Sequence, residues 1–98
     1  MAERRGGTIT QSGEDYRIVT GGTPQAVKAR PGVLGVISVT SAVTGSVTVY
    51  DNPSAATGNL IYSAATPAVG TVVTLNFPCR AGIFVTCGSA GTVAVSFQ

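Results

Sequence analysis

The sequence contains few ionised groups. Asp, Glu, Lys and Arg make up 10% of its 98 residues, whereas ordinary soluble domains contain roughly 25%. Histidine and tryptophan are absent, and only four side chains are carboxylates. Acid–base, nucleophilic and metal-dependent active sites all need poised titratable groups. We therefore expect a protein that is not an enzyme, that holds no metal or cofactor and that acts on no small-molecule substrate.

Long apolar runs and strong net charge are also absent. No segment reaches the roughly 18 consecutive apolar residues that a membrane-spanning helix needs. The formal net charge is only +2, which is too small for the many phosphate contacts on which nucleic-acid binding depends. Neither a membrane nor a nucleic acid is expected as a partner.

Cysteine is scarce, and its spacing argues against an intramolecular disulfide. Cys79 and Cys87 are separated by a segment with the alternation of a β-strand, and an extended segment of that length spans roughly 20 Å or more. An unstrained disulfide needs Cα atoms within about 7 Å of each other. Two reduced thiols are therefore expected, with Cys87 as a small core residue, which suits a protein that folds in a reducing cytoplasm.

Small and β-branched residues dominate the rest of the sequence. In the body of the chain, apolar residues alternate with Thr and Ser, which is typical of half-buried antiparallel strands. The alternation predicts a tight hairpin across Thr44 and Gly45, and a small antiparallel β-sandwich or barrel overall. Six strands are expected, at residues 36–43, 46–50, 59–63, 71–77, 83–87 and 93–97.

The only carboxylate in the body is Asp51, which precedes Asn52 and Pro53. This is a common turn sequence, because Asn and Asp side chains accept hydrogen bonds from the backbone that follows them. We expect Asp51 to form a turn rather than to hold a ligand.

Residues 1–32 differ in composition from residues 33–98, because they carry eight of the ten charged residues. Glycine and proline interrupt any long strand there, which predicts an extended N-terminal arm with at most one hairpin. The basic residues of this arm either keep it soluble or form ion pairs with an acidic partner surface. These candidate partner-binding residues are Arg4, Arg5, Arg17, Lys28 and Arg30.

The segment 35–54 contains the sequence VTSAVTGSVTVYDN, and a second pair of short β segments follows at 82–86 and 91–96. This pattern of strands and turns resembles small virion proteins of tailed bacteriophages, over about residues 33–97. The resemblance implies a β-sandwich or jelly-roll body. The family includes head decoration, or cement, proteins, which sit on the capsid lattice, often as trimers.

The resemblance and the low charge together predict a structural virion protein that is assembled in the host cytoplasm. We expect a capsid decoration protein whose arm binds the major capsid protein or another virion protein. An uncharged body gains by burying its flanks against copies of itself, so a homo-oligomer is expected, and the resemblance implies that a trimer is favoured. The alternative is a receptor- or carbohydrate-binding knob of a phage head or tail fibre, with residues 51–58 and 64–70 as its recognition loops.

Overall fold

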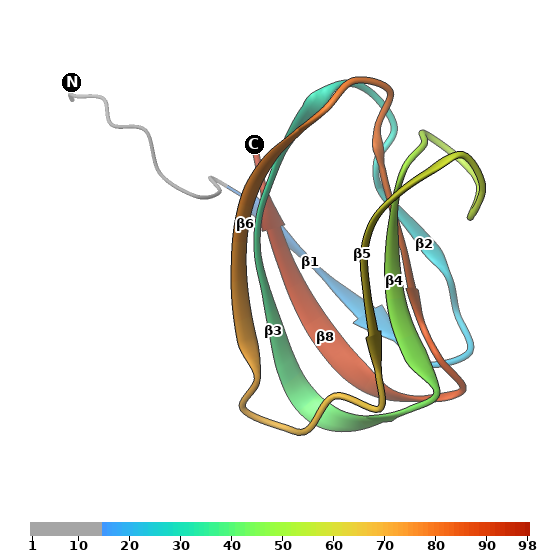
Figure 1. The fold of residues 1–98 in the computed structure, drawn as a ribbon, viewed down its shortest axis with the longest axis vertical. Helices are drawn as coiled ribbons and strands as arrows, with labels where there is room; N and C mark the ends of the chain where they lie inside the picture. Colours follow the sequence, from blue (N-terminus) through green and yellow to red (C-terminus); the bar gives the residue numbers. More distant parts are fainter. Residues whose placement is uncertain (1–14) are drawn as a thin grey trace, which may run out of the picture.

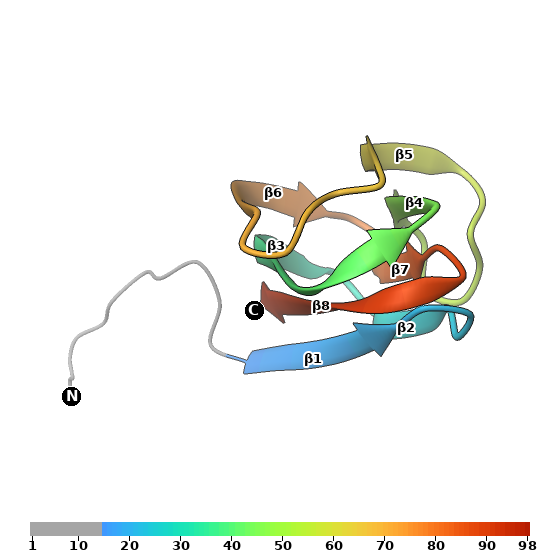
Figure 2. The ribbon, with the colours of Figure 1, turned by 90° about the horizontal axis from the view of Figure 1, so that it is seen from below.

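The computed structural model describes residues 15–98, which fold into two four-stranded antiparallel sheets packed face to face (Figures 1 and 2). One sheet has the strand order β1-β8-β3-β6 and the other has the order β2-β7-β4-β5. The described residues contain no helix, and thus none that could span a membrane. The strands are β1 (Asp15–Thr20), β2 (Gln25–Lys28), β3 (Gly32–Thr44), β4 (Ser46–Asp51), β5 (Asn59–Ala65), β6 (Val72–Cys79), β7 (Ile83–Cys87) and β8 (Ala90–Phe97).

Strands that follow one another in the sequence mostly lie in opposite sheets. Among consecutive strands in residues 15–98, only β4 and β5 pair as a hairpin, through the loop 52–58. Every other connection between the described strands crosses from one sheet to the other, which is the eight-stranded arrangement of a jelly roll. The expectation of an all-β, antiparallel, jelly-roll-like sandwich is therefore confirmed.

The expected hairpin across Thr44 and Gly45 is wrong. β3 pairs with β6 and β8, whereas β4 pairs with β5 and β7, so these two residues form a corner between the sheets. Gly45 has a φ of 98° there, a conformation that glycine adopts without steric cost. Alternation of apolar and polar residues identifies the buried face of a strand, but it does not identify the strand with which it pairs. A strand buries the same residues whether the next strand in the sequence lies beside it or in the opposite sheet.

The domain boundary expected at residue 32 also differs from the structure. β1 pairs with β8, and β2 pairs with β7, so residues 15–32 belong to the sandwich rather than to an arm. Gly21 and Gly22, which suggested an irregular segment, form the corner between β1 and β2. Both donate backbone hydrogen bonds to the β7–β8 region, which fixes this corner in place. The rest of the expected arm, residues 1–14, lies outside the described residues.

The core fills the space between the two sheets, and it consists mainly of β-branched residues. Their stiff side chains pack well on a pleated surface, and burial of their apolar area is the main favourable term in folding. The inner faces predicted from alternation are confirmed in the four central strands β3, β4, β7 and β8. The buried residues of these strands are Leu34, Ile37, Val39, Val43, Val47, Val49, Ile83, Val85, Cys87, Val93, Val95 and Phe97.

Candidate binding cleft

Three of the candidate partner-binding cations lie around one cleft. This cleft has a volume of about 440 Å³ and lies between the first residues of β1, the last residues of β2 and the end of β8. Arg17, Lys28 and Arg30 line it together with Asp15. The other lining residues are Ala26, Val27, Ala29, Phe97 and Gln98.

Strand register places Arg17 at this cleft. Arg17 lies directly opposite Val95 in the β1–β8 pair, and Val95 is fully buried between the sheets. Directly opposite residues share a face of the sheet, so Arg17 projects from the inner face of β1. Two residues further along the same face, Val19 is completely buried, whereas Arg17 is exposed. The space between the sheets is thus closed at Val19 and open at Arg17.

Lys28 is placed by a β-bulge and by a glycine. The register of β2 shifts between Ala26 and Lys28, so that Val27 is buried and Lys28 is only half-buried. The Lys28 side chain then crosses the backbone of Gly32. A Cβ atom at Gly32 would lie 2.7 Å from the Cδ atom and 2.8 Å from the Nζ atom of Lys28. The lysine amine therefore lies beside the start of β3, where a side chain larger than that of glycine would displace it.

The cleft gathers most of the charge of the sandwich. Residues 15–98 carry six charged side chains, and four of them line the cleft, three as cations and one as a carboxylate. The carboxylate, Asp15, accepts a hydrogen bond of 2.8 Å from the backbone N–H of Tyr16. Guanidinium groups bind carboxylates through paired hydrogen bonds. The arrangement is suited to acidic side chains of a partner.

The structure describes only part of the expected set of cations. Arg4 and Arg5 lie outside the described residues. Asp15 was not singled out from the sequence, and its role follows from the structure, in which it lies two residues before Arg17 in β1, so that both side chains share one face. Nothing in the sequence indicated that Gln98 lines the same cleft, because its place depends on the pairing of β8 with β1 and β3.

Asp51 is a structural residue, but the turn that it holds is distant in the sequence. One of its carboxylate oxygens accepts hydrogen bonds from the backbone N–H groups of Ala81 (2.8 Å) and Gly82 (3.3 Å), and the other accepts one from Arg80 (3.0 Å). These hydrogen bonds, led by that from Ala81, lower the pKa of Asp51. The local turn is held by Asn52 instead, whose side-chain oxygen accepts hydrogen bonds from the next backbone N–H groups.

The two cysteines are buried and free. Desolvation, followed by the nearby charge of Asp51, raises the pKa of Cys79 to about 11, and burial also raises the pKa of Cys87. Thiolates are the reactive form of cysteine, so neither side chain is poised for chemistry. Residues 15–98 also contain no group of His, Cys, Asp or Glu side chains that could hold a metal ion.

The two loops of the alternative hypothesis lie at opposite ends of the sandwich (Figure 1). Of the expected loops 51–58 and 64–70, the structure forms a loop over 52–58 before β5 and a loop over 66–71 after it, because residue 51 belongs to β4 and residues 64 and 65 belong to β5. A seven-residue strand spans roughly 23 Å, so these loops do not form one recognition surface.

Comparison with known proteins yields no match, either among family models, among curated proteins or among solved structures.

Proposed function

We propose that this chain is a non-enzymatic structural protein of a tailed-bacteriophage particle, a capsid decoration protein assembled in the host cytoplasm. Its basic cleft binds an acidic surface of the major capsid protein or of another virion protein. Arg17, Lys28 and Arg30 carry this contact, together with Arg4 and Arg5. The body associates with further copies, with a trimer favoured.

The observation that carries this proposal is the uneven distribution of charge. Four of the six charged side chains in residues 15–98 line one cleft at the β1/β2 edge. The remaining two, Asp51 and Arg80, are neighbours in space, because the Asp51 carboxylate binds the backbone of the turn that contains Arg80. The basic cleft suits attachment to an acidic partner surface at one place. The largely uncharged flanks suit contact with neutral protein surfaces. Many copies on a lattice add avidity, so each contact can be small.

A particle-binding experiment with charge reversals tests the proposal. The full chain, with Arg17→Glu or Arg30→Glu, is sedimented with phage particles that lack the protein. Each variant is expected to bind about tenfold or more weakly than the wild type, because a repelling charge replaces an attracting one. Thr23→Glu adds a negative charge at an exposed position in the corner between β1 and β2, outside the cleft, and serves as the control, with binding expected to be unchanged.

The outcome that contradicts the proposal is equal sedimentation of Arg17→Glu, Arg30→Glu and wild type. A double variant, Arg4→Glu with Arg5→Glu, separates the contribution of the N-terminal segment from that of the cleft. Deleting residues 1–30 is unsuitable for this purpose, since it removes β1 and β2 and with them the buried side chains of Val19 and Val27.

A further inference from the structure

The edge of the sandwich formed by β5 and β6 is open. Phe77 in β6 lies opposite Leu34 of β3, which is completely buried. Directly opposite residues share a face, so Phe77 faces the space between the sheets, yet 46% of its surface is exposed. Val73 in the same strand lies opposite Ile37, which is 1% exposed, and is itself only half-buried. The inner face of β6 is thus incompletely covered.

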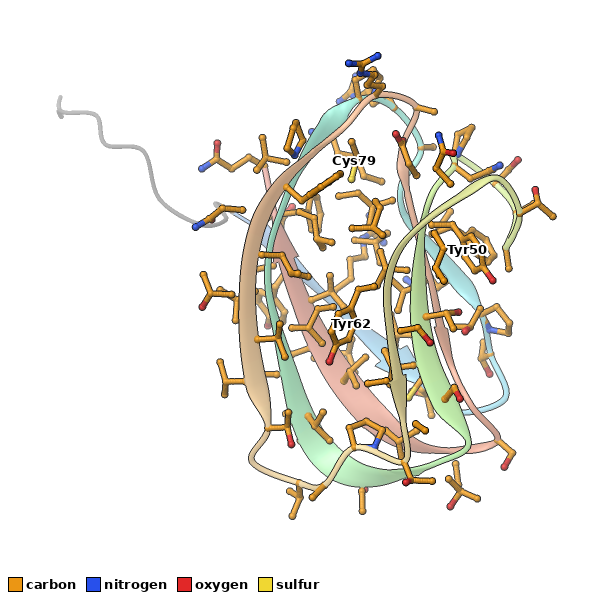
Figure 3. All side chains as sticks on the ribbon, in the orientation of Figure 1. Tyr50, Tyr62 and Cys79 are labelled. Carbon is orange, nitrogen blue, oxygen red and sulfur yellow. The ribbon has the colours of Figure 1, made fainter. Side chains whose placement is uncertain are left out.

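The same holds for β5 on the other side of this opening. Tyr62 lies opposite the completely buried Val49 and is only half-buried. It projects from β5 into the space between β5 and β6 (Figure 3). Ile61, Tyr62 and Leu75 pack against the core without being enclosed by it. We call this opening, framed by β5, the loop 66–71 and β6, the β5/β6 mouth.

A hollow of about 340 Å³ lies at one end of the β5/β6 mouth. Its apolar lining comes from both strands, and Asp51, Asn59 and Arg80 also line it. The apolar lining residues are Leu60, Ile61, Phe77 and Pro78. Leu60 is itself 52% exposed, so this end of the mouth presents a concentrated apolar surface.

The opposite edge of the sandwich, formed by β1 and β2, is closed and charged. At the β1/β2 edge the inner residues Val19 and Val27 are at most 2% exposed, and the charged cleft lies beside them. None of the 15 residues in β5 and β6 is charged. Charged side chains are a common means of keeping strand edges in solution. Such protection is present on β1 and β2 and absent from β5 and β6.

Both strands at the mouth also have a free backbone edge. Among the strands of residues 15–98, β5 pairs only with β4, and β6 pairs only with β3. An uncharged strand edge with exposed apolar side chains is a template for association with another chain. β6 is interrupted by a bulge, where Asn76 has a φ of 49°, and by Pro78, but its first half, Val72 to Leu75, contains neither.

We propose that the β5/β6 mouth is the self-association surface of this protein, and that a second copy of the chain covers it. This proposal rests on the self-association in the proposed function and names the surface that performs it. Because β5 and β6 carry no charged side chain, these strands of two copies can pack together without leaving a charge of their own unpaired. Copies arranged around a symmetry axis bring several mouths together, so that Phe77, Tyr62 and Val73 form a shared apolar core.

The size of the mouth agrees with a weak but specific contact. A strand of eight residues is roughly 26 Å long, and the two edges with their side chains are roughly 20 Å wide, which gives about 500 Å² for each copy. Two copies then bury about 1,000 Å², at the lower limit of specific interfaces. Association is therefore expected to depend on concentration and to be reinforced by multivalent attachment to a particle.

The test compares two substitutions at equally exposed positions. Phe77 and Ile18 are both 46% exposed, but Phe77 lies in the mouth and Ile18 on the outer face of β1. Light scattering of the full chain, from about 1 μM to about 1 mM, is expected to show a rising mass for the wild type and for Ile18→Asp. Phe77→Asp is expected to stay a monomer throughout, with its far-ultraviolet circular dichroism unchanged.

A second measurement uses the wild type alone, so that the proposal can be tested even if Phe77→Asp does not fold. Hydrogen exchange of the wild type at low and high concentration is expected to show increased protection of β5 and β6 and no change in β1 and β2. The proposal is overturned if the wild type stays a monomer at all concentrations. It is also overturned if Ile18→Asp dissociates the protein while Phe77→Asp still associates. Attachment to particles through the cleft is measured separately with Arg17→Glu. Absence of self-association through the β5/β6 mouth can therefore be distinguished from absence of particle binding through the cleft.

Discussion

At the scale of single residues, Asp51 shows how one carboxylate joins two connections of the fold. It ends β4, and its oxygens accept three backbone hydrogen bonds from residues 80–82, between β6 and β7. Gly82 is required in this contact, because a Cβ atom there would lie 2.6 Å from the backbone oxygen of Lys28 and 2.7 Å from the Cα atom of Pro53. The two connections are thus held together by one charge and by close backbone packing.

Replacing Asp51 by Asn is expected to lower the free energy of unfolding by about 1–2 kcal/mol at pH 7, because hydrogen bonds to a charged acceptor become neutral ones. The folded-state pKa of Asp51 lies below its ordinary value of 3.8. The stabilisation by the carboxylate is therefore complete above the unfolded pKa and is lost as the pH falls through the folded pKa. Urea unfolding of both proteins at pH 7 and at low pH measures this difference.

The difference between wild type and Asp51→Asn is expected to shrink as the solution is acidified below about pH 4. An equal difference at both pH values would show that the charge does not contribute. Other carboxylates titrate in both proteins alike, so they cancel in the comparison.

At the scale of elements, the corners between the sheets depend on backbone conformations that side chains do not permit. Gly91, the second residue of β8, has a φ of 103°, and a Cβ atom there would lie 2.6 Å from the Cα atom of Val43. Gly70, in the loop between β5 and β6, has a similar φ of 92° but has no atom within 4 Å of a Cβ position. Alanine substitutions at these two glycines therefore distinguish the free-energy cost of a positive φ from that of a steric clash.

Gly70→Ala is expected to lower the free energy of unfolding by about 1 kcal/mol, which is the cost of a positive φ alone. Gly91→Ala is expected to cost about 3 kcal/mol or more, since β3 must also shift away from β8. Thermal unfolding of both variants measures the two values. Equal losses would mean that β3 and β8 separate without cost at this point.

The elements also show where sequence reasoning succeeds and where it fails. Alternation identified the inner faces of the central strands, as for Val47 and Val49, because one face of each strand meets a complete core. In β6, alternation places Phe77 on one face with Val73 and Leu75, and the register shows that this face points inward. The Phe77 side chain is nevertheless half exposed, since no strand of residues 15–98 lies beyond β6 to cover it. Alternation missed β2, whose four residues are too few for a pattern.

At the scale of the whole molecule, the two edges of the sandwich differ in charge. The β1/β2 edge carries the basic cleft, and the β5/β6 edge is neutral and apolar. In the proposed function the first edge attaches the protein to the particle and the second joins copies to one another. Electrostatic attraction and burial of apolar surface respond differently to salt.

Raising the NaCl concentration from about 0.05 M to about 0.5 M is expected to weaken particle binding through the cleft, because the Debye length falls well below 10 Å. Self-association through the β5/β6 mouth is expected to persist, and sulfate is expected to strengthen it. Sedimentation with particles and light scattering of the free protein measure the two processes. Salt-resistant particle binding would contradict an electrostatic role for the cleft.

The sequence by itself determined the all-β class, the inner faces of the central strands and the concentration of charge before residue 31, because these follow from composition and from the two-residue period of a strand. The tertiary structure alone decided which strands pair, that residues 15–32 belong to the sandwich, and that Arg17, Lys28 and Arg30 share one cleft. It also decided that Asp51 holds a turn about 30 residues away. Strand partners and such contacts depend on long-range pairing, and the local alternation is the same for every pairing that buries the same faces.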